Sequence, residues 1–231
     1  MTQLGSALAG DGVTGAGDTF LGQRFRAAGL KVIGRTRSPE FAFNATTEPK
    51  VHGPTRNPYD LGRSVGGSSG GAGALVASRA LAVAHATDGG GSIRIPASLC
   101  GIVGLKPTRE RIPVGPGQWE GLHGMAHDFV LCRTLRDCAA MLDVLHGPAP
   151  GEKYVIPPPA RPPRRGGRRR PGAASGSAGR RTPGRARPVD PEVRAATERV
   201  AVALAGRATR SRQASPRSTT SSSTGRSWSG S

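Results

Sequence analysis

The sequence has few cysteines and no closely spaced pair of them. Cys100, Cys132 and Cys138 form no Cys-x-x-Cys motif and no cluster with the spacing of metal ligands. An odd number of cysteines, two of them within apolar sequence, is typical of reduced, buried thiols in a cytosolic protein. We therefore expect no metal centre and a cytoplasmic location.

Long apolar segments are also missing. No apolar run approaches the ~18 residues that a membrane-spanning helix needs. The N-terminal segment MTQLGSALAGDG lacks the basic region and apolar core of a secretory signal. The sequence thus predicts neither a membrane partner nor secretion.

Lysine is absent from residues 156–231, and acidic residues are rare there. This part carries 17 Arg and 3 acidic residues, a net charge of +14 out of +18 for the chain, whereas residues 1–155 have 16 basic and 12 acidic residues. The chain therefore consists of two parts, residues 1–155 and 156–231, that differ in composition. We expect a folded domain over 1–155 and a basic C-terminal tail.

The tail has no apolar periodicity over residues 156–188 and 207–231, which are rich in Arg, Pro, Gly and Ser. Such composition predicts disorder. Between these segments, residues 189–206 have the pattern of an amphipathic helix, with Asp190 as N-cap and Gly206 as C-cap.

The arginine-rich sequence has two interpretations. An arginine run such as that at 161–170 binds polyanions by counterion release, but it lacks interleaved aromatic residues and any nucleic-acid-binding module, so no specific nucleic-acid partner is expected. The same composition would result from a wrong reading frame in a GC-rich gene. Frameshifts on both sides of residues 189–206 would then explain the isolated helix.

The first 155 residues predict an α/β domain. A helix over 20–28 ends at Gly29 and precedes a short strand over 30–33, while the four prolines of 35–65 predict irregular structure. The remaining expected elements are a helix at 72–82, a strand from 83 with extended chain resuming before Pro96, strands at 99–108 and 129–131, and a helix from Thr134 to Leu145.

Two glycine-serine clusters stand out, GGSSGG at 66–71 and DGGGSIR at 88–94. Serines in such clusters serve as phosphate cradles, or as nucleophiles beside an oxyanion hole of backbone N–H groups. The Walker A pattern GxxxxGK[ST] is absent, and GGSSGG does not fit the GxGxxG spacing of a dinucleotide-binding loop. The nucleophile interpretation is therefore favoured over phosphate binding.

The second cluster continues as TDGGGSIRIPASLCGIVGLKPT, and TTEPKVHGPTRNPYDLGRSV precedes the first. Together with HDFVLCRTLRDCAAMLDVL, these segments resemble the amidase signature family, serine amidohydrolases with a Ser–cis-Ser–Lys triad. The resemblance runs from about Gly5 to Val155 and is strongest to bacterial amidases of the cyclic amide oligomer hydrolase type. It implies a partial amidase-signature fold, with a mixed central sheet covered by helices.

The resemblance also implies roles for individual residues. Ser92 would be the acylated nucleophile, and Ser68, after a cis peptide bond to Gly67, would relay its proton. No metal or cofactor is implied. The oxyanion-hole donors would be the N–H groups of Gly89, Gly90, Gly91 and Ser92, and the residues bracing this turn would be Asp88 and Arg94.

The third triad member is a lysine, which the resemblance places upstream of the segment LGSALAG and thus before Met1. None of the lysines present, Lys31, Lys50, Lys106 and Lys153, matches its position. We therefore expect impaired hydrolysis of a small-molecule amide through Ser92. The alternative is a non-catalytic fragment whose arginine-rich tail binds polyanions non-specifically.

Several other residues have simpler interpretations. His85 and His123 have no acidic residue placed to orient them, which disfavours a Ser-His-Asp triad. Ser69 is interpreted as a turn residue and Cys100 as a buried apolar residue, while Trp119 and Phe129 line either a substrate funnel or the core. Arg79 and Glu110 depart from the family's pattern.

Overall fold

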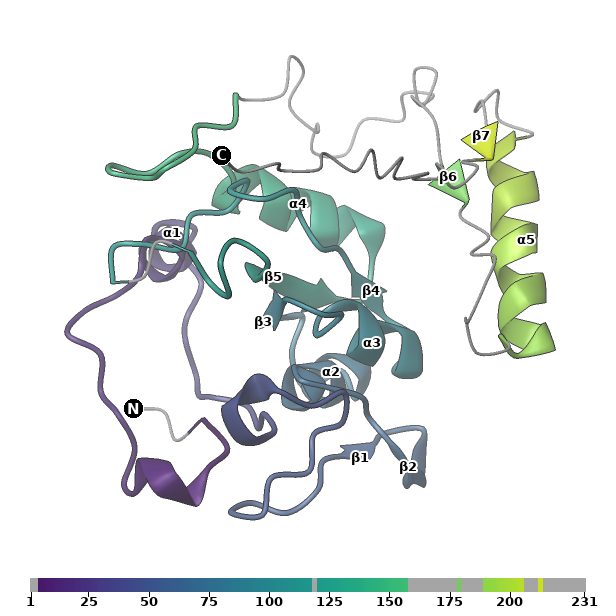
Figure 1. Cartoon of the computed structure of the whole chain (residues 1–231), viewed down its shortest axis with the longest axis horizontal. Coiled ribbons are helices and arrows are strands. Elements are labelled where there is room, and N and C mark those ends of the chain that lie inside the picture. Colours follow the sequence, from purple (N-terminus) through teal and green to yellow (C-terminus); the bar gives the residue numbers. More distant parts are fainter. Residues whose placement is uncertain (1–3, 118–119, 158–177, 180–188, 206–211, 214–231) are drawn as a thin grey trace, which may run out of the picture. The chain divides into compact units, whose positions relative to one another are not determined.

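The computed structural model describes residues 4–117, 120–157, 178–179, 189–205 and 212–213 (Figure 1). The chain divides into two units, residues 1–167 and 168–231. The first unit contains the 3-10 helices η1 (Ala7–Ala9) and η2 (Glu40–Ala42), the helices α1 (Phe20–Ala27), α2 (Gly70–Ala77), α3 (Arg94–Leu99) and α4 (Leu135–Leu145), and the strands β1 (Arg56–Asn57), β2 (Asp60–Ser64), β3 (Val83–Asp88), β4 (Val103–Gly104) and β5 (His127–Cys132).

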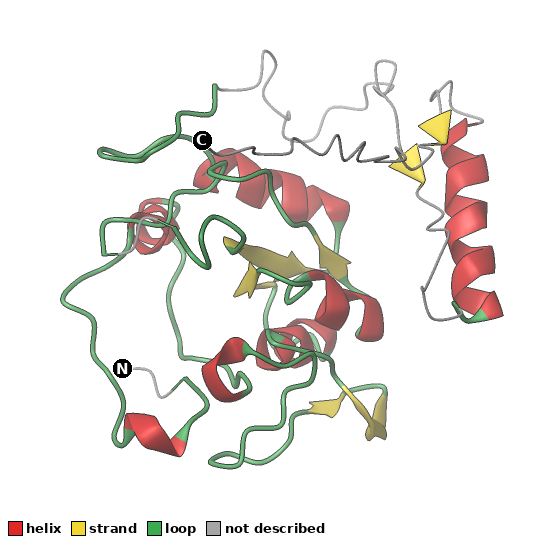
Figure 2. Ribbon diagram, in the orientation of Figure 1, coloured by secondary structure: helices red, strands yellow, loops and turns green. Residues whose placement is uncertain are grey.

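The centre of this unit is a sheet with strand order β3-β5-β4. β5 is antiparallel to both neighbours, pairing Val83 with Cys132 and Asp88 with His127 on one side, and Gly104 with Leu131 on the other. α2 packs on β3 and β5, α4 packs on β5 and β4, and these two helices lie on opposite sides of the sheet (Figure 2). The α/β fold expected from the sequence is confirmed.

The core lies on both faces of β5. Phe129, Val130, Leu131 and Cys132 are consecutive and completely buried, and successive strand residues point to opposite faces. Phe129 is therefore a core residue rather than part of a substrate funnel. Helical side chains that complete this core are Leu21, Val76, Met141 and Leu145.

Threonine side chains cap the beginnings of α1 and α4, and the cap of α1 is Thr19, next to Asp18. Thr19 Oγ1 accepts the N–H of Gly22, and Thr134 Oγ1 accepts the N–H of Asp137, so each threonine satisfies a free donor of the first turn. Gly29 follows α1 with φ +77°, the left-handed conformation that a helix-ending glycine adopts. Local sequence therefore determines where α1 and α4 begin and end.

Two predicted extended segments are wrong. Residues 30–33 form no strand, and Val32 and Ile33 are exposed. The chain after Ser92 forms α3 instead of resuming an extended course before Pro96. Pro96 is the third residue of α3, where no intrahelical N–H bond is needed, so the helix accommodates it. Within the irregular 35–65 segment, β1 and β2 form a small antiparallel pair.

All three cysteines are free and buried, as the sequence predicted. Among the residues that the structure describes, no helix has the length and apolar character needed to cross a membrane. No group of three His, Cys, Asp or Glu side chains in those ranges is arranged to hold a metal ion.

The second unit contains β6 (Ala178–Gly179), α5 (Pro191–Ala205) and β7 (Arg212–Gln213), with β6 and β7 parallel. α5 confirms the predicted helix, because Asp190 Oδ1 accepts the N–H of Glu192 at 2.8 Å and Pro191 is the first helical residue. Gly206 and nearly all of the two segments predicted to be disordered lie outside the described residues.

Both residues that depart from the family pattern have left-handed backbones. Arg79 follows the last turn of α2 with φ +66°, and Glu110 has φ +57°. Side chains with a Cβ disfavour this region, and glycine does not. Glu110 is also buried beside Glu152, and the burial and this second carboxylate raise the pKa of Glu110.

We predict that Arg79→Gly stabilises the first unit by about 1 kcal/mol, because glycine adopts the left-handed conformation without steric cost. The free energy of unfolding in urea would measure this. Ser78→Gly is the matched control, since Ser78 has φ −71°, and there glycine should destabilise by about 0.5–1 kcal/mol. Equal effects of the two changes would contradict the prediction.

We predict that Glu110→Gln changes how stability depends on pH. A carboxyl whose pKa is raised in the folded state binds its proton more tightly there, so wild-type stability should fall as pH rises from 4.5 through the raised pKa. Glutamine has no proton to lose. The stability of Glu110→Gln should therefore not exceed that of the wild type at pH 4, and the difference in favour of the variant should grow towards pH 8. Thermal unfolding of both proteins across this range is the measurement, and parallel curves would refute the prediction.

Candidate active site

The two glycine-serine clusters form adjacent loops. Ser68 precedes α2, and Ser92 lies between β3 and α3. The N–H of Ser69 donates to the carbonyl oxygen of Ser92 at 3.3 Å. The Ser69 hydroxyl also donates to the carbonyl of Thr87 and accepts its N–H, both at 3.3 Å. These bonds hold the loop of Ser68 against the end of β3 and the loop of Ser92.

The role of Ser69 could not be read from the sequence. It was interpreted as a turn residue, and nothing in GGSSGG distinguishes one serine from the other. The structure shows that its side chain joins the two loops, whereas Ser68 makes no such bond within the described part of the chain. The Gly67–Ser68 peptide bond is cis, as the resemblance implied.

Asp88 organises the loop that carries Ser92. It is the last residue of β3 and is completely buried. Its Oδ1 accepts the N–H of Gly91 at 2.8 Å, and its Oδ2 accepts those of Ile93 at 3.2 Å and Arg94 at 3.3 Å. One carboxylate therefore fixes the backbone on both sides of Ser92.

The Arg94 guanidinium compensates the buried charge of Asp88. Its Nε and Nη2 donate to the two carboxylate oxygens at 2.9 and 2.8 Å, the bidentate geometry of a strong charge-assisted pair. Burial alone would raise the pKa of Asp88, but the hydrogen bonds from Arg94 and the backbone outweigh it and hold that pKa below its ordinary value. The bond to Asp88 in turn raises the pKa of Arg94.

The N–H groups of the Ser92 loop divide into two sets. The N–H of Gly91 donates to the Asp88 carboxylate. Those of Gly89, Gly90 and Ser92 make no hydrogen bond to any residue that the structure describes. Of the four donors expected from the sequence, three are therefore available to a ligand, and Gly91 serves the structure of the loop.

The two serine hydroxyls differ in exposure. Ser92 is half-buried, whereas Ser68 is buried. Neither hydroxyl is hydrogen-bonded within the described ranges. Of the lysines, Lys106 donates to the carbonyl of Pro107 at 2.7 Å and Lys153 to Glu120 at 3.0 Å, so neither of them is bonded to a serine.

The histidine interpretation needs one correction. His85 Nε2 lies 3.0 Å from Asp128 Oδ1, so an acidic residue does orient this histidine. The sequence alone did not reveal this pair, because Asp128 lies on β5 and is far from His85 in the sequence. The His85 ring packs edge-on against Phe25 of α1, and among the described residues it forms no hydrogen bond with either serine. Burial raises the pKa of the Cys100 thiol to about 11, which disfavours a thiolate nucleophile there.

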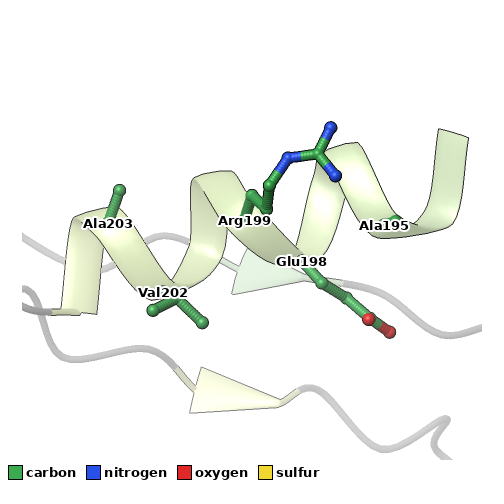
Figure 3. A pocket seen from close by; sticks show the side chains of 5 residues that line it. All are labelled: Ala195, Glu198, Arg199, Val202 and Ala203. Carbon is green, nitrogen blue, oxygen red and sulfur yellow. The ribbon is translucent and has the colours of Figure 1, made fainter. Parts of the chain in front are cut away.

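A shallow hollow lies along α5 in the second unit (Figure 3). It is lined by one helix face with no convergent polar groups, so it lacks the features of a catalytic pocket. Its lining residues are Ala195, Glu198, Arg199, Val202 and Ala203.

We predict that Asp88→Asn destabilises the first unit by about 3 kcal/mol, because it removes a buried carboxylate that is bonded to Arg94 and to three backbone N–H groups, and puts an amide in its place. The pKa of Asp88 is lowered in the folded state, so the wild-type advantage should be complete at neutral pH and disappear as pH falls below about 4. Chemical unfolding at pH 7 and pH 3 tests this. Asp60→Asn, at an exposed carboxylate with lowered pKa, is the control and should have a much smaller effect.

Comparison with known proteins places these loops in a family. The amidase family model matches residues 5–223. The chain is 46% identical over 190 residues to the 6-aminohexanoate-cyclic-dimer hydrolase of Paenarthrobacter ureafaciens, and 45% identical to that of Pseudomonas sp. (strain NK87). Each alignment covers 81% of this chain but 38% of the relative.

The structural comparison agrees. A solved structure of 6-aminohexanoate cyclic dimer hydrolase complexed with substrate matches with a TM-score of 0.81 and 42% identity, over 92% of this chain and 44% of that one. A bacterial aryl acylamidase of the amidase signature family matches with a TM-score of 0.60 and 35% identity, over 65% of this chain and 31% of that one. The chain thus spans less than half the length of the proteins it matches. From the family match, the fold and the paired glycine-serine loops, we conclude that this chain belongs to the amidase family.

Proposed function

We propose that this chain acts on carboxylic amides as an amidase, through an acyl-enzyme on Ser92. The observation that carries the proposal is the set of N–H groups at Gly89, Gly90 and Ser92 that have no partner among the described residues, next to the half-exposed Ser92 on a loop held by Asp88. Donors of this kind stabilise a developing oxyanion, and losing one typically costs about 3–4 kcal/mol of transition-state stabilisation.

The proposed reaction has two stages. Ser92 Oγ attacks the amide carbonyl carbon, its proton passes to Ser68, and the carbonyl oxygen becomes an oxyanion held by the loop N–H groups. The C–N bond then breaks, Ser68 gives a proton to the nitrogen, which leaves as the amine, and the acyl group stays on Ser92. Water attacks this ester in the second stage, releasing the carboxylic acid and restoring the Ser92 hydroxyl.

Ser68 suits the relay role by its position. It is buried, its loop is bonded to the carbonyl of Ser92 through the Ser69 N–H, and its hydroxyl is unpaired among the described residues. The resemblance implies that Ser68 passes its proton on to a lysine, which we place at none of the described lysines. We therefore propose slow turnover for this chain by itself.

The substrate class follows from the relatives. The similarity to 6-aminohexanoate-cyclic-dimer hydrolases supports a small linear or cyclic amide. The arginine-rich segments of the tail lie almost entirely outside the described residues, so polyanion binding by them stays a prediction from composition.

A fluorophosphonate probe tests the proposal, because it phosphonylates an activated serine. We expect the full chain to be labelled at Ser92, as located by peptide mass spectrometry. Ser92→Ala should abolish labelling, and Ser68→Ala should slow it by about tenfold or more, since proton transfer by a positioned group contributes about 10²–10⁴-fold.

The control is Ser78→Ala, which removes an exposed hydroxyl that bonds only to the carbonyl of Leu75 and should leave labelling unchanged. Absence of labelling in the wild-type chain, or labelling that survives Ser92→Ala, would overturn the proposal.

A further inference from the structure

Thr47 is a buried polar residue for which the reaction above has no role. It lies in the irregular segment after η2 and is completely buried. Its hydroxyl donates to the carbonyl of Gly66 at 2.8 Å, with the carbonyl of Ser68 also within reach at 3.3 Å. The same oxygen accepts the N–H of Gly70 at 3.1 Å. All of these partners belong to the loop that carries Ser68.

These bonds attach to the loop on both sides of Ser68. One carbonyl lies two residues before it, and the N–H lies two residues after it, at the start of α2. The backbone of Thr46 packs directly against Gly67, leaving no room for a side chain there. The loop is therefore held by the 46–47 backbone from one side and by a single hydroxyl across its two ends.

Burial makes this hydroxyl hard to replace. Water cannot readily supply the missing bonds at a fully buried position, and an unpaired buried N–H or carbonyl costs more than an average hydrogen bond contributes. Gly70 is also needed, because a Cβ there would overlap the Thr47 side chain. Removing the hydroxyl should thus shift the loop rather than leave it in place.

We infer that Thr47 is a positioning residue for Ser68 in the amide-hydrolysing reaction, an inference that rests on the proposed function. The Ser69 N–H bond to the Ser92 carbonyl transmits the constraint. Fixing residues 66–70 fixes Ser68 against the loop of the nucleophile. Displacement of a reacting group by about 1 Å can cost 10²-fold in rate, so one hydroxyl remote from the reacting atoms controls the rate of proton relay.

The chain offers a matched set of variants. Thr47→Val removes the hydroxyl with little change of shape, and Thr47→Ser retains it. Thr55→Val is the control, because the Thr55 hydroxyl lies nearby, is buried and has no partner within the described residues. The backbone bond from Thr55 N–H to the Thr47 carbonyl, at 2.8 Å, is unaffected by that change.

The first readout is the kinetics of fluorophosphonate labelling of the full chain. For Thr47→Val we expect the limiting labelling rate to fall about tenfold or more, with an unchanged half-saturating probe concentration and full final labelling. Thr47→Ser and Thr55→Val should stay close to wild type. A merely structural role would lower the fraction of chains labelled without slowing the rest, and that result, or an unchanged rate, would overturn the inference.

The second readout separates the inference from the proposed function. Hydrogen exchange should be about fivefold faster at the Gly70 amide in Thr47→Val, corresponding to loss of one hydrogen bond, and unchanged in Thr55→Val. If the wild-type chain is not labelled, the proposed function fails, and exchange alone decides whether Thr47 holds the loop. Unchanged exchange at residues 66–70 would then refute it.

Discussion

The buried carboxylate of Asp88 is the constraint on which the candidate site depends. A turn of three glycines has no side chains with which to fix its own conformation, and its backbone would sample many states. Asp88 supplies three acceptor bonds to that turn, and Arg94 neutralises the charge that those bonds require to be buried. The buried Asp88 carboxylate, paired with the half-exposed Arg94, thus gives the backbone around Ser92 a defined conformation.

Asp88 also determines which N–H groups of the Ser92 loop are used within the loop and which are not. Four N–H groups lie in a short stretch, and Asp88 takes that of Gly91 while Gly89, Gly90 and Ser92 remain unpaired among the described residues. Gly90 is exposed, and Gly89 and Ser92 are partly exposed, so these donors are accessible to solvent or to a ligand. Their position beside the Ser92 hydroxyl suits a ligand that carries or develops negative charge.

The loop of Ser68 is held by a different principle. Asp88 acts from within its own turn, whereas Thr47 and Ser69 connect segments far apart in the sequence. Both use a hydroxyl that donates and accepts at once, so neither introduces a charge into the buried region. The loop of Ser92 is thus fixed by an ion pair, and the loop of Ser68 is fixed by neutral hydrogen bonds.

Local features of the sequence predicted the parts of the fold that depend on local chemistry. Thr134, Gly29 and Asp190 mark helix ends through bonds within one turn. The family resemblance pointed to Ser68 and Ser92, whose loops are adjacent in the structure, and to Asp88 and Arg94, which form an ion pair. What could not be predicted involved tertiary contacts. Three of the four residues 30–33 are apolar, but they have no partner strand in the described structure. Pro96 fits the first turn of a helix that its neighbours determine. The partners of Thr47, Ser69 and His85 lie on other elements.

The order of the sheet has a consequence for how the site is assembled. β5 is the middle strand but the last of the three in the sequence, so β3 and β4 have no common partner until residues 127–132 are present. On a ribosome, the turn that carries Ser92, after the end of β3, would emerge well before β5, with which β3 pairs. Pairing over such a separation carries a loop-closure cost and slows folding. The glycine-rich turn would therefore acquire its final shape only after residues 127–132 have joined the sheet.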